Sequence, residues 1–216
     1  MLKKYVIGPL ETNCYLYTDD ITGHSAVIDP AYPDKRLLSD LKNERVDYIF
    51  ITHAHIDHIY GAAVVKELTG ARVVAHPLED KRLHDTDENL YDTFHSLYQN
   101  QGIYKDPYVA VDIDETVDTG SVITLGKTMF SVLHTPGHTN GSVSFITDRD
   151  IFCGDTIFEG SYGRVDFPSG SFADLTDSFR RLCFLDGDYM IYPGHQGSTT
   201  LRNERNFNPL KTYLYN

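Results

Sequence analysis

The sequence predicts an α/β fold with β-sheet in both halves of the chain. Short apolar stretches bounded by Gly, Pro, Asp or Asn recur along its length, which is the pattern of strands. Longer stretches with apolar residues at helical spacing separate some of them. The chain has 216 residues, 41% of them hydrophobic and 23% charged, so it can bury a substantial core. We therefore expect a single domain that spans residues 1–216.

The predicted strands are short apolar stretches rich in β-branched and aromatic residues. Each stretch ends at a turn-forming residue, and polar side chains follow several of them directly. The stretches are residues 5–8, 13–19, 24–30, 46–52, 71–76, 128–135, 141–148, 149–155 and 188–194.

Two core-facing helices are predicted between these strands. Residues 58–70 carry apolar side chains at helical spacing and end at Gly70, a typical helix stop. Residues 171–182 begin with a capping pattern from Ser171 to Asp174, and an apolar face follows. Residues 81–114 are polar and rich in Tyr, without clear periodicity, so we expect a loop-and-helix excursion near the active-site cleft.

Composition indicates which binding partners the protein is expected to have and in which cellular compartment it is expected to lie. The formal net charge is -12, from 19 Lys and Arg against 31 Asp and Glu, which argues against binding to nucleic acid or to an anionic membrane. The three cysteines have no zinc-ribbon or disulfide-framework spacing. No secretory signal or membrane span is recognisable, so a cytoplasmic protein is expected.

The chemistry is expected where polar residues follow the strands. The segment THAHIDH, residues 52–58, places three histidines and an aspartate directly after a strand. Further histidines and aspartates follow three later strands. If these strand ends meet at one edge of the fold, seven candidate metal ligands converge there. They are His53, His55, Asp57, His58, His138, Asp155 and His195.

The number and type of these ligands favour two divalent ions over one. His53 and His55 can reach one ion from a loop, whereas Asp57 and His58 enter the following helix and point to a second position. A carboxylate can bridge two ions, and such a site leaves room for solvent and substrate. A closed structural metal site and chance clustering are the alternatives. We assign no role to the isolated histidines His24, His76, His84, His95 and His134.

The sequence resembles the metallo-β-lactamase fold superfamily, and within it the small glyoxalase II-like (hydroxyacylglutathione hydrolase-like) branch. The resemblance covers nearly the whole chain. It rests on the segments TNCYL, THAHIDHIYG, HTPGHTNGSVSF, FCGDTIF, GRVDFPSG and YPGHQGSTTLRNERNFNPL.

This resemblance implies an αβ/βα four-layer sandwich, in which two facing mixed sheets have helices outside. It also implies a ligand set: His53, His55 and His138 for the first metal, Asp57, His58 and His195 for the second, and Asp155 as the bridge. The expected cofactors are two divalent ions, zinc first, with iron or manganese as alternatives.

The implied activity is hydrolysis of a small-molecule thioester of the S-lactoylglutathione type by a metal-bridged hydroxide, with Asp57 orienting it or moving its proton. Longer members of this branch have a C-terminal helical region that contacts glutathione, and that mode of binding is not carried over here. GRVDFPSG is similar to a segment of persulfide dioxygenases, which use a single iron, so such a reaction is the main alternative. Lactonase, nuclease and non-catalytic metal binding are further alternatives.

Two residues are predicted to contact substrate. Arg164 has the donor geometry to bind a substrate carboxylate, although an ion pair with Asp166 is the structural alternative. Tyr162 is expected to line the cleft. The sequence leaves the oligomeric state, the acyl group and the thiol carrier open.

Overall fold

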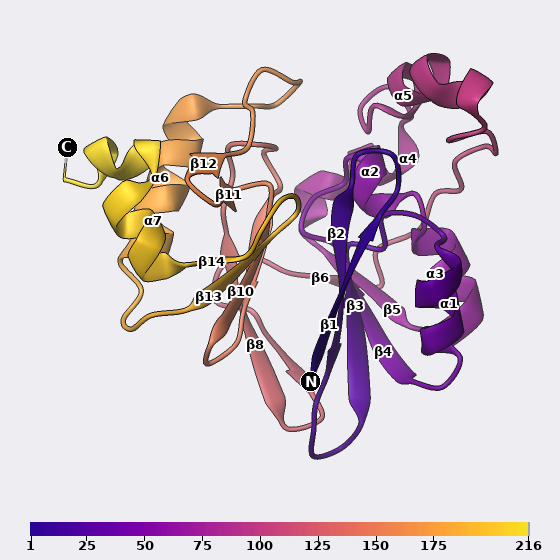
Figure 1. The fold of residues 1–216 in the computed structure, drawn as a ribbon, viewed down its shortest axis with the longest axis horizontal. Coiled ribbons are helices and arrows are strands. Elements are labelled where there is room, and N and C mark those ends of the chain that lie inside the picture. The colour runs from indigo at the N-terminus through magenta and orange to yellow at the C-terminus, as the bar shows by residue number, and fades with distance from the viewer. Residues whose placement is uncertain (216) are drawn as a thin grey trace.

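Two six-stranded sheets face each other, and helices cover the outer face of each (Figure 1). The computed structural model describes residues 1–215. The arrangement is the αβ/βα four-layer sandwich that the sequence predicts. The candidate ligands lie in segments that follow strands of both sheets.

The first sheet is formed by the N-terminal half of the chain. Its first three strands are antiparallel, and the next three are added in parallel. In spatial order they are β1 (Leu2–Ile7), β2 (Thr12–Thr18), β3 (His24–Ile28), β4 (Arg45–Phe50), β5 (Arg72–Ala75) and β6 (Glu115–Thr116).

The second sheet is antiparallel except where β10 and β13 pair in parallel. In spatial order it contains β14 (Thr199–Thr200), β13 (Met190–Pro193), β10 (Asp150–Gly154), β9 (Val143–Ile146), β8 (Thr128–His134) and β7 (Val122–Leu125). A separate small hairpin consists of β11 (Ile157–Phe158) and β12 (Ser161–Tyr162). All the predicted strands are present, and the strands that were not predicted are mostly two residues long.

The helix predicted over residues 58–70 is divided into α2 (Ile56–Ile59) and α3 (Ala62–Thr69). The division falls at Gly61, whose N–H donates to the Pro30 carbonyl at 2.8 Å. A Cβ at this position would lie 2.4 Å from that oxygen, so the close approach of the two segments requires glycine.

Helices cover both outer faces (Figure 1). The first sheet is covered by α1 (Lys35–Leu41) and α3, and the second by α6 (Phe172–Cys183), α7 (Leu201–Phe207) and η3 (Pro209–Tyr213). The predicted cap is confirmed, because the Ser171 hydroxyl accepts the Asp174 N–H at the start of α6. No helix within residues 1–215 is long and apolar enough to cross a membrane.

The core between the sheets is aromatic. Phe50 of the first sheet stacks on Phe145 of the second, with ring centroids 4.6 Å apart, and Phe130, Phe152 and Tyr15 pack around them. Large rigid side chains in contact across the interface resist sliding of one sheet over the other. The strand ends of both sheets are therefore held in a defined position.

The excursion over residues 81–114 lies above the end of the first sheet, at the top right of Figure 1. It is preceded by η1 (Pro77–Glu79), begins within α4 (Asp80–His84), and contains α5 (Tyr91–Tyr98) and η2 (Gln99–Gln101). Its anchor is Tyr104, which is fully buried in the outer core of the first sheet. Leu90 and Phe94 of the excursion line the cavity beside the candidate ligands.

Candidate metal centre

The strand ends bring all seven predicted ligands together. The loop after β4 carries His53 and His55, and Asp57 and His58 follow in α2. The ligands of the second sheet lie after its strands: His138 after β8, Asp155 after β10 and His195 after β13.

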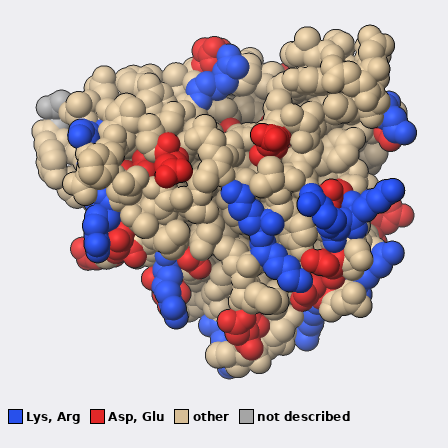
Figure 2. All heavy atoms as spheres, viewed as in Figure 1, with Lys and Arg blue, Asp and Glu red and all other residues tan. Residues whose placement is uncertain are grey.

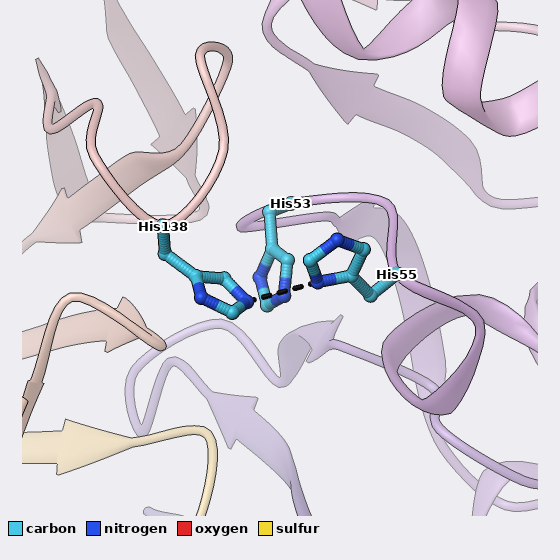
Figure 3. Close-up of side chains that lie close together, drawn as sticks. All are labelled: His53, His55 and His138. Carbon is cyan, nitrogen blue, oxygen red and sulfur yellow. Dashed lines mark hydrogen bonds between the residues drawn. The ribbon is translucent and has the colours of Figure 1, made fainter. Parts of the chain in front are cut away.

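Three histidines form the first group. His53, His55 and His138 each offer a ring nitrogen, and these atoms lie within 4.8 Å of one another. Figure 3 shows the rings pointing toward one another from loops of both sheets, with His55 Nδ1 2.9 Å from His138 Nε2. All three side chains are buried. This matches the grouping expected for the first metal.

A second group consists of Asp57, His58 and His195. The Asp57 Oδ2 atom lies 3.2 Å from His195 Nε2 and 3.5 Å from His58 Nε2. Asp155 lies between the groups, with its carboxylate 3.6 Å from His138 Nε2 and 3.4 Å from His58 Nε2. Its carboxylate thus contacts histidines of both groups.

Unpaired polar atoms at this position test whether a metal fits. The His53, His55 and His58 Nε2 atoms and Asp155 Oδ1 are buried without a hydrogen-bond partner in the described structure. Unsatisfied buried polar atoms are rare and each costs about 1–3 kcal/mol. Imidazole nitrogens and carboxylate oxygens are the donors that zinc, iron and manganese accept. The residues therefore fit divalent metal ions.

Electrostatics at the centre also favour a bound cation. Burial lowers the pKa of His58, but Asp57 and Asp155 outweigh burial and hold this pKa well above its usual value. Burial is the largest single effect on Asp57 and raises its pKa, but His58 and His195 together outweigh burial and lower the pKa to about 2. An imidazolium thus lies between two carboxylates, and a metal ion that binds here takes the place of its proton.

Outer contacts hold the ligands, and sequence reasoning missed these residues. Asp29, just after β3, accepts the Thr52 N–H and hydroxyl and faces His58 Nδ1 at 2.9 Å. The Thr12 hydroxyl donates to Asp57 Oδ2 at 3.1 Å. Carboxylate and hydroxyl partners of this kind orient metal ligands. The available signal was that Asp29 lies at the end of a predicted strand, residues 24–30.

Glu79 is a second residue that sequence reasoning missed. Its buried carboxylate accepts the Ala54 N–H, between two ligands, and the Thr139 hydroxyl, next to His138. Arg82, also buried, donates to Glu79 at 2.8 Å and to the Ser169 hydroxyl at 2.7 Å. One ion pair thus connects ligand loops of both sheets.

A cavity of about 470 Å³ opens over the ligands, a size typical of small-molecule sites. Arg164 and Tyr162, the two residues predicted to contact substrate, both line it. The structural alternative for Arg164 is also present, because its guanidinium makes two 2.6 Å hydrogen bonds to Asp166. The same guanidinium lies 3.9 Å above the ring of Phe167.

A further histidine cluster lies outside this centre. His76 and His134 stack beside Asp118, although neither histidine was assigned a role. His76 Nδ1 accepts the Leu78 N–H, so its proton is on Nε2, 3.6 Å from the Asp118 carboxylate. A nitrogen that carries a proton is not free to bind a metal, so we interpret this cluster as an internally paired group.

Two facing sheets that direct histidines and aspartates to one edge define a class of metal-binding α/β sandwich proteins. Residues 7–195 match the family model of the metallo-beta-lactamase superfamily, and the chain belongs to that superfamily. Fold, ligands and family together define a metal-dependent hydrolase of this superfamily.

Curated relatives cover almost the full chain. An uncharacterized protein of Aquifex aeolicus is 34% identical over 100% of this chain and 99% of its own. The hydroxyacylglutathione hydrolase GloC of Haemophilus influenzae is 31% identical over 94% of each chain.

Solved structures agree with the fold. The BLEG-1 B3 metallo-beta-lactamase matches with a TM-score of 0.85 and 29% identity, covering 100% of both chains. The protein TTHA1623, solved in a di-iron-bound form, matches with a TM-score of 0.78 and 30% identity, covering 96% of this chain and 98% of its own.

Proposed function

We propose that the chain hydrolyses thioesters, in a reaction of the type that cleaves S-lactoylglutathione, with two divalent metal ions, zinc first. The observation that carries the proposal is the pair of ligand groups joined by Asp155 under an open cavity. The similarity to a hydroxyacylglutathione hydrolase over almost the whole chain supports the substrate class.

The ligand groups divide between two ions. His53, His55 and His138 would hold the first, Asp57, His58 and His195 the second, and Asp155 would contact both. When bound, such ions lower the pKa of a water ligand to roughly 7 and polarise a substrate carbonyl. The chain's own contribution is to hold the ligands rigidly and to place a carboxylate beside the reacting water.

Asp57 is the residue placed for that second role. It lines the cavity, and the Thr12 hydroxyl and His195 hold its Oδ2. Its low pKa keeps it ionised, so it accepts a hydrogen bond from the attacking water and orients that water toward the carbonyl carbon. A thiolate is a good leaving group, since thiols have a pKa near 8.5, so no acid is needed on that side.

Arg164 and Tyr162 remain the proposed substrate contacts. Tyr162 offers a hydroxyl at the cavity wall. The guanidinium of Arg164 is held by Asp166 in a bidentate ion pair. A substrate carboxylate would therefore bind Arg164 only by displacing Asp166.

The test combines metal content with activity on one sample. We expect about two metal ions per chain, turnover of S-lactoylglutathione, and no oxygen uptake on glutathione persulfide. His138→Gln should lose metal and at least about 100-fold in kcat/KM, because it removes a ligand of the first group. His84→Gln is the matched control, since that exposed side chain contacts only Asp80 and Asp112 among the described contacts.

Two results would contradict the proposal. A single iron with oxygen uptake on the persulfide would identify a dioxygenase at the same site. Full activity of the His138→Gln variant would mean that the histidine groups do not carry the reaction.

A further inference from the structure

We infer that the preferred substrate carries an uncharged, apolar group on the thioester sulfur, rather than a charged peptide thiol such as glutathione. The inference rests on the proposed thioester hydrolysis and names the substrate class of that same site. It follows from what the cavity offers beyond its metal ligands.

Apolar side chains make up most of the remaining cavity wall. They come from separate parts of the chain, namely the β1–β2 loop, the excursion, the β11–β12 hairpin and the segment after β12. They are Leu10, Leu90, Phe94, Phe158 and Phe167.

This apolar surface begins directly at the ligands. The ring of Phe167 lies 5.5 Å from that of His55, and the ring of Phe158 lies 6.0 Å from that of His195. An apolar group bonded to the reacting centre would therefore contact aromatic rings on either side. Pockets built this way bind ligands mainly by burying apolar surface.

Charge complementarity to glutathione is missing. Among the residues described, Arg164 is the only Lys or Arg that lines the cavity. Its positive charge is balanced by Asp166, to which it donates two hydrogen bonds. The other polar wall residues outside the ligands, Ser161, Tyr162 and Gln196, are uncharged. The two carboxylates and the ammonium of glutathione would thus be desolvated without ionic partners, which is costly.

Basic side chains are few on the upper surface in Figure 2, although Lys4 donates to the carbonyl of the wall residue Gln196 at 2.7 Å. On the face shown in Figure 2, few Lys or Arg side chains lie in the upper part, where α5 is located, and most gather lower, around β1 and α1. The net charge of -12 adds a general repulsion of anionic carriers. Both features favour a neutral substrate.

Three thioesters of one acyl group test the inference on the metal-loaded wild-type protein. The lactoyl thioesters of glutathione, N-acetylcysteamine and benzyl mercaptan share the reacting carbonyl and differ in the thiol. Glutathione is charged, N-acetylcysteamine is short and neutral, and benzyl mercaptan is neutral and apolar. We expect kcat/KM for the benzyl ester to exceed that for the glutathione ester by about 10-fold, with the N-acetylcysteamine ester no better than the benzyl ester.

Phe94→Ala and Phe158→Ala locate the preference in the cavity. Each should lower kcat/KM for the benzyl ester by about 10-fold and leave the N-acetylcysteamine ester within about two-fold. Leu97→Ala is the matched control, because Leu97 lies on α5 like Phe94 but is 62% exposed and does not line the cavity.

The outcomes separate the two proposals. If the glutathione ester is the best of the three, the inference on the carrier is wrong and thioester hydrolysis stands. If none of the three is hydrolysed by the metal-loaded protein, thioester hydrolysis itself is wrong. If the benzyl ester is preferred but neither phenylalanine variant changes that, the apolar group does not bind in this cavity and the inference is also overturned.

Discussion

At the scale of single residues, the site depends on how the outer nitrogen of each histidine is bound. An acceptor that holds one ring N–H leaves the lone pair of the other nitrogen for a metal. In four of the five candidate histidine ligands Nδ1 is held in this way, so that Nε2 faces the centre. The partners are the Thr52 hydroxyl for His53, Asp29 for His58, the Arg164 carbonyl for His138 and the Leu10 carbonyl for His195.

Asp29 is the charged member of these partners, so its replacement has the clearest expected effect. Asp29→Asn keeps a side chain that tolerates the left-handed backbone at this position, where φ is 50°, but removes the negative charge beside His58. We expect metal affinity to fall about 10- to 100-fold, measured by competition with a chromophoric chelator. Asp47→Asn is the control, because Asp47 pairs with His24 away from the ligand groups. Equal losses in both variants would contradict the assigned role.

The convergence of the candidate ligands could be predicted from the sequence, whereas these partners could not. His53, His138 and His195 each follow an apolar stretch, so their convergence follows from strand ends meeting at one edge. Asp29 also follows a strand, but a single carboxylate without ligand spacing does not stand out in the sequence. Its role depends on β3 lying beside β4, which is a tertiary feature.

At the scale of elements, the start of the excursion holds the ligand loops. The ion pair of Glu79 and Arg82 contacts the loop after β4 through Ala54, and the β8–β9 loop through Thr139. The sequence of this region shows no clear period, because its short helices are held by buried contacts rather than by an amphipathic pattern. The two-residue strands were missed for a similar reason, since alternation cannot be recognised over two positions.

Replacing Glu79 should therefore affect the whole element. Glu79→Gln leaves the Arg82 charge buried without a counter-charge, so we expect the free energy of unfolding to fall by about 3–5 kcal/mol. Glu88→Gln is the matched control, since Glu88 pairs with the exposed Lys81, and such pairs contribute less than about 1 kcal/mol. Denaturant unfolding of the metal-loaded proteins measures both. If the two variants lose equal stability, Glu79 does not hold these loops.

At the scale of the whole molecule, hydrogen bonds connect the two sheets at both ends of the sandwich. Near the site, Asn13 and Tyr15 donate to the Pro193 carbonyl at 2.8 and 2.7 Å. At the opposite end, Asp19 of the β2–β3 turn accepts the Lys127 N–H and the Thr128 hydroxyl. The sequence predicted both sets of strands, but their facing arrangement followed from the family resemblance, because strand patterns do not specify how sheets pair.

The Asp19 contacts should make stability depend on pH. The Thr22 hydroxyl is the main cause that holds the pKa of Asp19 below its usual value, and the Thr128 hydroxyl contributes. Because the folded-state pKa is lowered, this stabilisation is present above pH about 4 and is lost as pH falls below it. The Asp19→Asn variant should be less stable than the wild type at pH 7. Between pH about 4 and 2 it should lose less stability than the wild type does. Denaturant titrations at each pH measure both differences. Asp148→Asn, at an exposed site, is the control. Parallel pH curves for Asp19→Asn and the wild type would contradict the expectation.

Metal removal should affect the whole molecule, because the first ligand group draws His53 and His55 from one sheet and His138 from the other. A metal that binds only the folded state stabilises it by about 4 kcal/mol at 1,000 times its Kd. For a chain of this size we expect chelation to lower Tm by roughly 10 °C, measured by calorimetry before and after dialysis against the chelator and again after metal is restored. The His138→Gln variant should show a much smaller shift, since its first ligand group has no member from the second sheet. An unchanged Tm after chelation of the wild type would mean that the metal does not link the two sheets.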